Sequence, residues 1–329
     1  MNMLEISASK TPQPWPLRMV GNLNPLIIGL AVLYVAIALW SDRFLALSNQ
    51  MNITRQVAVY LVIAMGQTFV ISSRGIDLSV GSVLGFVGCV LALMLDAGVP
   101  VPVGVAAAIL LGAAFGAVNG LVVTKLKVNP LIATLGMLVA LRGLTHILMG
   151  STAVTRLPSS LVFLGQGFVG PVPVPALLSL AVALVCWWLY YHTRFGRHTV
   201  AIGSNEDACG LSGIRVDRQK ILIYAFQGAC VGFAATLIVG RLNAASPDLG
   251  LNYELHIIAA VVLGGTALYG GMGTIFGTVL GIFTIGVIEN GMVLVGANFH
   301  VQRVLIGTLL VAAVAYQEFR RRQIDRRPL

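Results

Sequence analysis

The sequence predicts an all-α polytopic membrane protein with about ten transmembrane helices, arranged as two inverted five-helix repeats. Of its 329 residues, 57% are hydrophobic and only 10% are charged, whereas a soluble domain is about 45–50% apolar and about 25% charged. The apolar residues form long unbroken runs, unlike the short alternating strands of an outer-membrane barrel. This composition excludes a disordered protein, a disulfide scaffold and an ordinary cytosolic enzyme.

Ten apolar runs approach the roughly 20 residues that a membrane-spanning helix needs. They cover 25–41, 56–73, 79–96, 101–124, 130–149, 173–191, 220–240, 256–269, 274–296 and 302–317. The eighth run is short and is expected to form a tilted or partial span. The chain then divides into a cytoplasmic N-terminal segment, 1–24, a transmembrane domain, 25–317, and a basic tail, 318–329.

The basic residues set the orientation. Ten crossings place both termini on one side, and the formal net charge of +9 comes from residues that flank apolar runs rather than from a nucleic-acid-binding surface. Five loop residues fall on the far side: Arg43, Arg55, Arg156, Arg241 and Arg303. Fifteen fall on the side of the termini: Lys10, Arg18, Arg74, Lys125, Lys127, Arg194, Arg197, Arg215, Arg218, Lys220, Arg320, Arg321, Arg322, Arg326 and Arg327. Because basic residues favour the cytoplasm, we expect both termini there.

A weak internal repeat relates the two halves of the chain. A shift of 171 residues aligns Asn119-Gly120 with Asn290-Gly291 and Asp77-Leu78 with Asp248-Leu249, in the same order. The shift moves five spans, an odd number, so the halves have opposite orientations. Inverted repeats are typical of transporters whose pathway lies near the repeat interface; chance similarity between apolar helices is the alternative.

The most distinctive polar stretch lies within a predicted cytoplasmic segment, 199–219. Asn205 is suited to cap a short helix, Glu206 and Asp207 complement the positive end of its dipole, and Gly213 is suited to end it. The residues concerned are Ser204, Asn205, Glu206, Asp207, Ala208, Leu211, Ser212 and Gly213. We expect Ala208, Cys209 and Leu211 to form a small apolar face. A helix this short needs a docking partner for stability, so it either seats in a partner's groove or is an ordinary interfacial loop.

A second candidate is the glycine-containing loop between the second and third spans, with Asp77, Ser79 and Gly81. Asp77 is expected to cap a helix that begins at Leu78. The loop is either a capped cytoplasmic turn or a break in the helix that lines a cavity. Polar residues within spans make Asn119, Thr134 and Asn290 candidates for a substrate pathway, and Glu289 and Arg142 are intramembrane charges.

Sites for catalysis, metal or nucleotide are not supported. No lysine follows a glycine, so a P-loop is excluded, and the five histidines lack metal-ligand spacing. The four cysteines form no Cys-x-x-Cys and are expected to be unpaired packing residues. We therefore expect a chain that is not an enzyme and holds neither a metal nor a cofactor.

Several motifs together resemble the permease subunits of ribose-type monosaccharide ABC importers, over residues 44–316. They are Gly75–Ser82, Asn129–Gly136, Gly203–Asn205 with Ser212–Ile214, Ile258–Thr266 with Gly270-Gly271, Asn290-Gly291 and Gln302. The resemblance implies an ABC permease fold with segment 204–214 as the coupling helix. It also implies a second permease chain, cytoplasmic ATPase subunits that bind ATP and Mg, and a periplasmic sugar-binding protein, in the lipid of a bacterial inner membrane.

Two other readings remain open at this stage. An ABC permease for branched-chain amino acids or nucleosides would share the fold, and a gradient-driven secondary transporter would fit the inverted repeat. The second reading needs buried acidic groups, of which Glu289 is the one candidate. A membrane enzyme is a weaker third.

Overall fold

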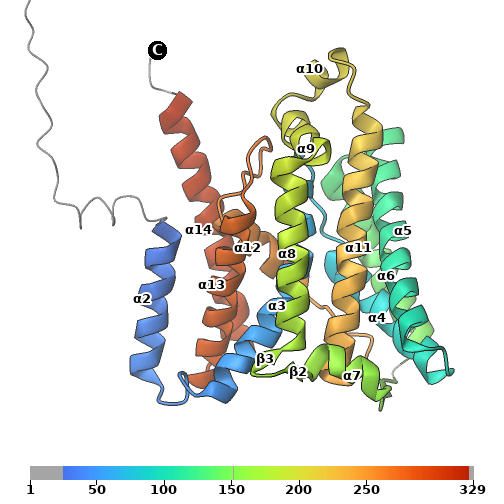
Figure 1. Ribbon diagram of the computed structural model, residues 1–329. Helices are drawn as coiled ribbons and strands as arrows, with labels where there is room; N and C mark the ends of the chain where they lie inside the picture. The colour runs from blue at the N-terminus through green and yellow to red at the C-terminus, as the bar shows by residue number, and fades with distance from the viewer. Residues whose placement is uncertain (1–24, 151, 326–329) are drawn as a thin grey trace, which may run out of the picture.

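The computed structural model describes residues 25–150 and 152–325, and in these residues the chain is almost wholly helical (Figure 1). The helices are α2 (Pro25–Trp40), α3 (Leu47–Ser72), α4 (Val80–Asp96), α5 (Val101–Lys125), α6 (Pro130–Met149), α7 (Ser159–Gln166), α8 (Val174–His192), α9 (Arg194–Ser204), α10 (Glu206–Leu211), α11 (Val216–Leu242), α12 (Tyr253–Leu263), α13 (Ile275–Leu294) and α14 (Phe299–Asp325). The whole predicted N-terminal segment, 1–24, and the end of the basic tail, 326–329, lie outside the described residues.

Each of the ten predicted runs coincides with a helix, and the all-α polytopic class is confirmed. Six helices are long and apolar enough to cross a membrane, namely α3, α5, α6, α8, α11 and α13, and four shorter apolar helices lie in α2, α4, α12 and α14. Predicted bounds were too short at the polar ends of α3, α11 and α14, because those helices continue past their apolar stretches. The eighth run was predicted too long: α12 ends at Leu263, where Gly265 has a φ of 94°.

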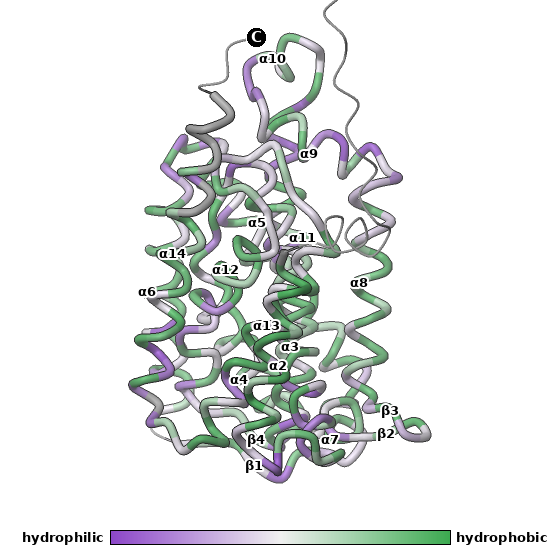
Figure 2. Tube along the Cα trace, turned by 90° about the vertical axis from the view of Figure 1, so that its left-hand side faces the viewer, coloured by the Kyte–Doolittle hydropathy of each residue, from purple (hydrophilic) through white to green (hydrophobic). Residues whose placement is uncertain are grey.

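Two pairs of very short strands lie at one end of the bundle. β1 (Val154–Thr155) pairs antiparallel with β4 (Ala244–Ala245), and β2 (Phe168–Val169) pairs antiparallel with β3 (Val172–Pro173). These strands and α7 lie opposite the end that carries α10 (Figure 1 and Figure 2). The start of α2 and the end of α14 lie toward the α10 end (Figure 1). Hydrophilic segments gather toward both ends, and hydrophobic residues dominate the helices between them (Figure 2).

α3 and α11 form the centre of the bundle. The apolar stretch of α3 is 83% buried and that of α11 is 67% buried, whereas that of α6 is 17% buried. Exposed apolar side chains on α5, α6 and α8 therefore face lipid or a partner chain.

Small residues bring α5 and α11 into close contact. Gly112, Gly116 and Gly120 are spaced four residues apart on one face of α5, opposite Gly228 and Gly232 of α11. A Cβ on Gly112 would lie 2.2 Å from the carbonyl oxygen of Gly228, so the two backbones touch. This is the packing that small-xxx-small sequences allow in membranes.

Candidate functional site

The segment after α3, residues 73–79, runs as non-helical chain through the protein interior. Asp77 is 3% exposed and Ser79 is fully buried. Asp77 Oδ1 accepts hydrogen bonds from the Ser79 backbone N–H, at 2.8 Å, and from the Ser79 hydroxyl, at 2.6 Å. The predicted helix start at Leu78 is wrong: α4 begins at Val80, because Asp77 closes a turn onto Ser79 instead of capping a helix. The loop is therefore a buried break in the helix.

Two of the predicted pathway residues brace this segment. Asn119, on α5, donates to the Ser79 hydroxyl at 2.9 Å. Thr134, on α6, donates to its own helix and, at 3.3 Å, to the carbonyl of Ile76. Both side chains are buried. Thr134 satisfies a carbonyl of the non-helical backbone, and Asn119 satisfies the Ser79 hydroxyl.

Gly81, the second residue of α4 and just after this segment, packs against the chain that follows α11. A Cβ on Gly81 would lie 2.5 Å from the carbonyl oxygen of Gly250, and a Cβ on Gly250 would lie 2.4 Å from that of Gly81. Gly250 has a φ of 74°, which favours glycine. On the same stretch, Arg142 of α6 donates to the carbonyls of Pro247 and Leu249 at 3.1 and 3.0 Å.

The predicted short helix is present as α10, which projects beyond the neighbouring helices (Figure 1). The Asn205 side chain accepts from the Ala208 N–H at 2.9 Å, and Gly213 has a φ of 83°, so both expected ends of the turn are confirmed. The expected apolar face is different: Cys209 is buried, whereas Leu211 is 92% exposed. The exposed surface of α10 is the one that carries Ala208 and Leu211.

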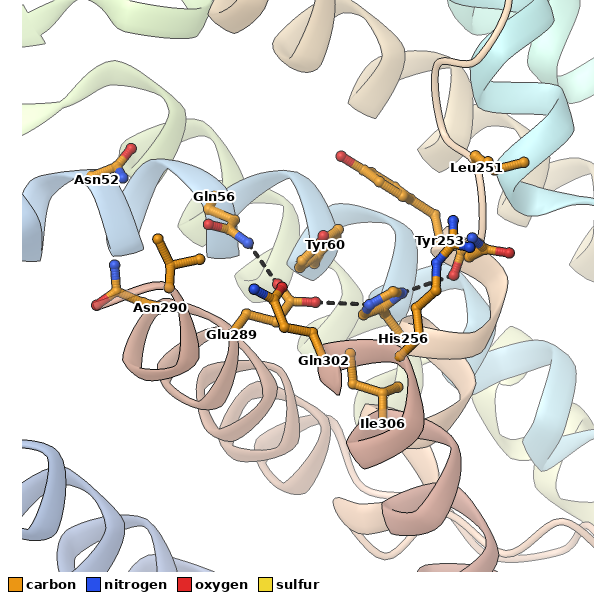
Figure 3. A pocket seen from close by; sticks show the side chains of 13 residues that line it. Asn52, Gln56, Tyr60, Leu251, Tyr253, His256, Glu289, Asn290, Gln302 and Ile306 are labelled. Atoms are coloured by element: carbon orange, nitrogen blue, oxygen red, sulfur yellow. Dashed lines mark hydrogen bonds and ion pairs between the residues drawn. The ribbon is translucent and has the colours of Figure 1, made fainter. Parts of the chain in front are cut away.

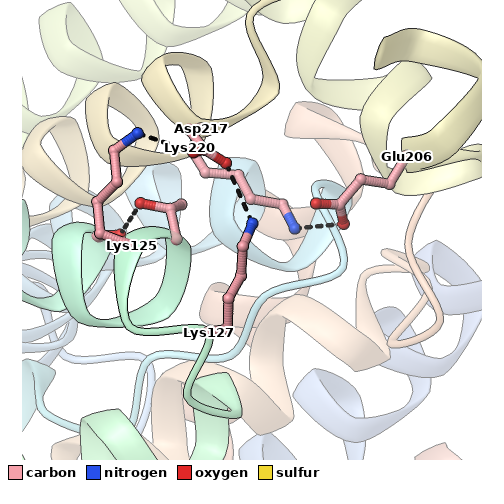
Figure 4. A network of polar contacts seen from close by, with 7 residues as sticks. Lys125, Lys127, Glu206, Asp217 and Lys220 are labelled. Carbon is pink, nitrogen blue, oxygen red and sulfur yellow. Dashed lines mark hydrogen bonds and ion pairs between the residues drawn. The ribbon is translucent and has the colours of Figure 1, made fainter. Parts of the chain in front are cut away.

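Ion pairs fix this end of the bundle (Figure 4). Lys220 of α11 lies 2.5 Å from Glu206 at the start of α10. Lys125 and Lys127, at and just after the end of α5, lie 2.9 and 3.5 Å from Asp217 of α11. The first pair ties α10 to α11, and the others tie the end of α5 to the same helix.

A cavity of about 220 Å³, lined by both polar and apolar side chains, lies toward the opposite end of the bundle, between α3, α12, α13 and α14 (Figure 3). Glu289 lies between two partners there: its Oε1 is 2.8 Å from His256 Nε2, and its Oε2 accepts from Gln56 at 2.5 Å. The Tyr60 ring stacks on the His256 imidazole at 5.9 Å between centroids. Glu289 and Tyr60 are buried, whereas Gln56 and His256 are half-buried.

Asn290 lines the same cavity and exchanges two hydrogen bonds with Asn49, at 2.9 and 2.8 Å. The three pathway candidates are thus separated, since Asn119 and Thr134 hold the 73–79 segment. Sequence reasoning missed Gln56, Tyr60 and His256 as members of a site. The polar side chain of Gln56, one helical turn before Tyr60, was the sequence feature that could have indicated this site.

A metal centre finds no support in the described residues, which contain no group of three or more histidine, cysteine or acidic side chains placed to hold an ion. The four cysteines are free and buried, as expected. The polar groups of the chain instead fix backbone, line the cavity or tether α10.

Comparison with known proteins relates most of the chain to transport permeases. Residues 49–314 match the family described as "Branched-chain amino acid transport system / permease component". No solved structure matches the chain.

Curated relatives carry sugar-import names. The chain is 40% identical to the ribose import permease protein RbsC of Escherichia coli strain K12 over 292 residues, 88% of this chain and 91% of that protein. It is 40% identical to RbsC of Bacillus subtilis strain 168, over 87% of this chain and 90% of that protein. It is 37% identical to the D-allose transport system permease protein AlsC of E. coli K12, over 83% of this chain and 84% of that protein. The chain therefore belongs to this family of transport permease components, and its resemblance to the ribose-type sugar permeases is confirmed.

Proposed function

We propose that this chain is the membrane-spanning subunit of an ABC importer that moves a monosaccharide into a bacterial cell. The observation that carries the proposal is the high identity, over nearly full length, to permeases named for ribose, D-allose and L-arabinose. Those names favour a sugar over branched-chain amino acids or nucleosides as cargo. They also favour ATP-driven import over a gradient-driven transporter, in which Glu289 would have been the coupling group.

The proposed architecture is a ten-span permease of two inverted halves, with both termini in the cytoplasm. Its support is a correspondence between the halves. α3 and α11 are long central helices, each is followed by a non-helical segment, and each segment leads into a shorter helix, α4 or α12. A second permease chain would cover part of the exposed apolar surface.

Energy is supplied from outside the chain in this proposal. A separate ATPase subunit would bind ATP and Mg, and α10 would seat in its groove through Leu211 and Ala208. The Glu206–Lys220 pair would pass the motion of α10 directly to α11, which is packed against α5 and α3. Such rigid-body coupling would switch the permease between outward- and inward-facing states, with sugar delivered by a periplasmic binding protein.

The test of the proposed function uses the permease, its cognate ATPase and its binding protein in lipid nanodiscs. We expect ATP hydrolysis to rise when one sugar of a ribose, allose and arabinose panel is added, and only with the binding protein present. Absence of stimulation by every sugar, with an assembled and active ATPase, would overturn the cargo assignment.

The role of α10 has its own test. Leu211→Asp places a charge on an exposed apolar docking surface, and we expect co-purification with the ATPase to fall at least tenfold, because burying an unpaired charge is costly. Asn205→Pro is expected to give the same loss by disrupting the cap. Leu242→Asp, at the opposite end of α11 and 54% exposed, is the matched control and is expected to co-purify normally. Retained ATPase with Leu211→Asp would contradict the assignment.

A further inference from the structure

The cavity between α3, α12, α13 and α14 has a mouth and a closed floor. Asn52 and Arg303 at its rim are exposed, whereas Tyr60 and Glu289 are 5% and 7% exposed. α3 begins and α13 ends at the end of the bundle opposite α10 (Figure 1). The cavity therefore lies toward the face where the proposed binding protein would release its ligand.

The His256–Glu289 pair at the floor of the cavity is electrically neutral although it contains a carboxyl group. The His256 Nδ1 lies 2.8 Å from the carbonyl oxygen of Asn252, which can only accept, so Nδ1 carries a proton. One further proton then lies between His256 Nε2 and Glu289 Oε1, at 2.8 Å. Whichever atom holds it, the pair has no net charge. The charged groups near this pair are Arg303, which lines the cavity, and Arg241, whose guanidinium donates to the Asn52 side chain at 3.3 Å.

The cavity walls carry side chains that can form hydrogen bonds with the hydroxyl groups of a ligand. Asn252 and Gln302 carry amides, which both donate and accept hydrogen bonds, and Tyr60 and Tyr253 contribute aromatic rings. Within the described residues, the Asn252 side chain makes no hydrogen bond. Asn252 has a left-handed backbone conformation, with a φ of 64°, and is the last residue before α12, where it lines the cavity. The volume of about 220 Å³ is below the ~300–1,000 Å³ of pockets for drug-sized ligands.

We infer that this cavity is a subsite for a neutral polyol, a monosaccharide, at the outer entrance of the permease. The inference rests on the proposed function and adds to it a location and a set of contacts. Glu289 is held in place by Gln56 and His256 as an oriented acceptor, and the amides of Asn252 and Gln302 supply further hydrogen bonds to the sugar hydroxyls. Buried ionisable groups in a membrane protein are costly and are expected to be kept for function.

A matched pair of glutamines allows a direct test. Gln302 and Gln166 are both half-buried, and each donates one hydrogen bond to a backbone carbonyl, of Ala297 at 3.3 Å and of Arg241 at 2.8 Å. Only Gln302 lines the cavity. Gln302→Met and Gln166→Met therefore make the same chemical change inside and outside the proposed subsite. Asn252→Gly is a second cavity variant, because glycine accepts the left-handed backbone at that position.

The experiment measures uptake of ribose, allose and arabinose, and ATP hydrolysis, by the whole importer in proteoliposomes with saturating binding protein. For the transported sugar, we expect Gln302→Met and Asn252→Gly to lower uptake about two- to tenfold, the effect of a lost hydrogen bond. Gln166→Met should match the parent in both sugar uptake and ATP hydrolysis.

A second readout monitors occupancy directly. A cysteine at Gln302, introduced as Gln302→Cys, is labelled with a small hydrophilic thiol reagent, and the transported sugar is expected to slow labelling severalfold. Gln166→Cys should be labelled at the same rate with and without sugar. The subsite is overturned, and the proposed function is kept, if the parent transports sugar but two results are found together. The first is that Gln302→Met and Gln166→Met give the same uptake, and the second is that sugar does not slow the labelling of either cysteine. Failure of the parent to transport any of the three sugars overturns the proposed function and the subsite with it.

Discussion

The segments that follow the two central helices provide opposite solutions to the same structural problem. Each interrupts the helical chain inside the bundle, so each exposes backbone groups that need partners. After α3, the partners are buried side chains: Thr134 and Tyr224 donate to the Ile76 carbonyl, and Gln67 donates to that of Asp77. The Asp77 side chain in turn accepts from the Ser79 N–H. After α11, the partners are strand β1, turns of the segment itself and the guanidinium of Arg142, beside the cavity.

Two aspartates that the repeat aligns show the contrast most clearly. Asp77 is 3% exposed and accepts two hydrogen bonds from Ser79, whereas Asp248 is exposed. The first segment has one side chain from each of α5 and α6 fixing it in place. The second has Asn243 and Asn252 in left-handed conformations at its two ends. We infer that the first segment contributes mainly to stability and the second mainly to ligand entry.

Replacing the two aspartates should show the largest difference between the segments. Asp77→Ala removes two hydrogen bonds and leaves a buried N–H unpaired, so we expect a loss of about 2–3 kcal/mol in the free energy of unfolding. Asp248→Ala changes an exposed side chain and should stay within about 0.5 kcal/mol of the parent. Unfolding in one detergent, followed by helical circular dichroism, measures both. Equal losses for the two variants would remove the distinction.

The helices of this fold could be predicted from the sequence because long apolar runs are a local signal. α12 was predicted too long because its apolar run continues past the turn at Gly264 and Gly265, where local conformation ends the helix. α7 and α9 were missed as separate helices because neither forms an apolar run of spanning length.

The side-chain contacts of the sites could not be predicted, because their partners are far apart in the chain. Asn119 is 40 residues from Ser79, and Gln56 is 233 residues from Glu289. Asn119 was correctly singled out as a polar residue within an apolar span. A residue that donates to a buried hydroxyl and a residue that lines a substrate pathway both appear in the sequence as one polar residue in an apolar run, so the sequence could not distinguish the two roles. The N-cap at Asn205 was predictable, since the accepting side chain and its donor, the Ala208 N–H, lie three residues apart.

The glycine contact between the segments provides a second, intermediate test. Gly81→Ala introduces a Cβ close to the Gly250 carbonyl and the Glu254 carboxylate, so we expect a loss of about 2 kcal/mol from overpacking. Gly136→Ala, in α6 with nothing within 4 Å of the added Cβ, is the control and should be tolerated. The same unfolding measurement applies. If Gly81→Ala is as stable as Gly136→Ala, the two segments are not in fixed contact.

The smallest expected effect is at Tyr224 of α11, whose hydroxyl lies over Gly75 and donates to the Ile76 carbonyl at 3.4 Å. Tyr224→Phe should cost no more than about 0.5 kcal/mol, because the bond is long and Thr134 also donates to that carbonyl. Tyr191→Phe, at an exposed ring on α8, is the control and should not change unfolding. A loss above about 2 kcal/mol at Tyr224 would mean that a single contact holds the 73–79 segment. The contrast between the segments would then depend on that contact rather than on a network that several helices share.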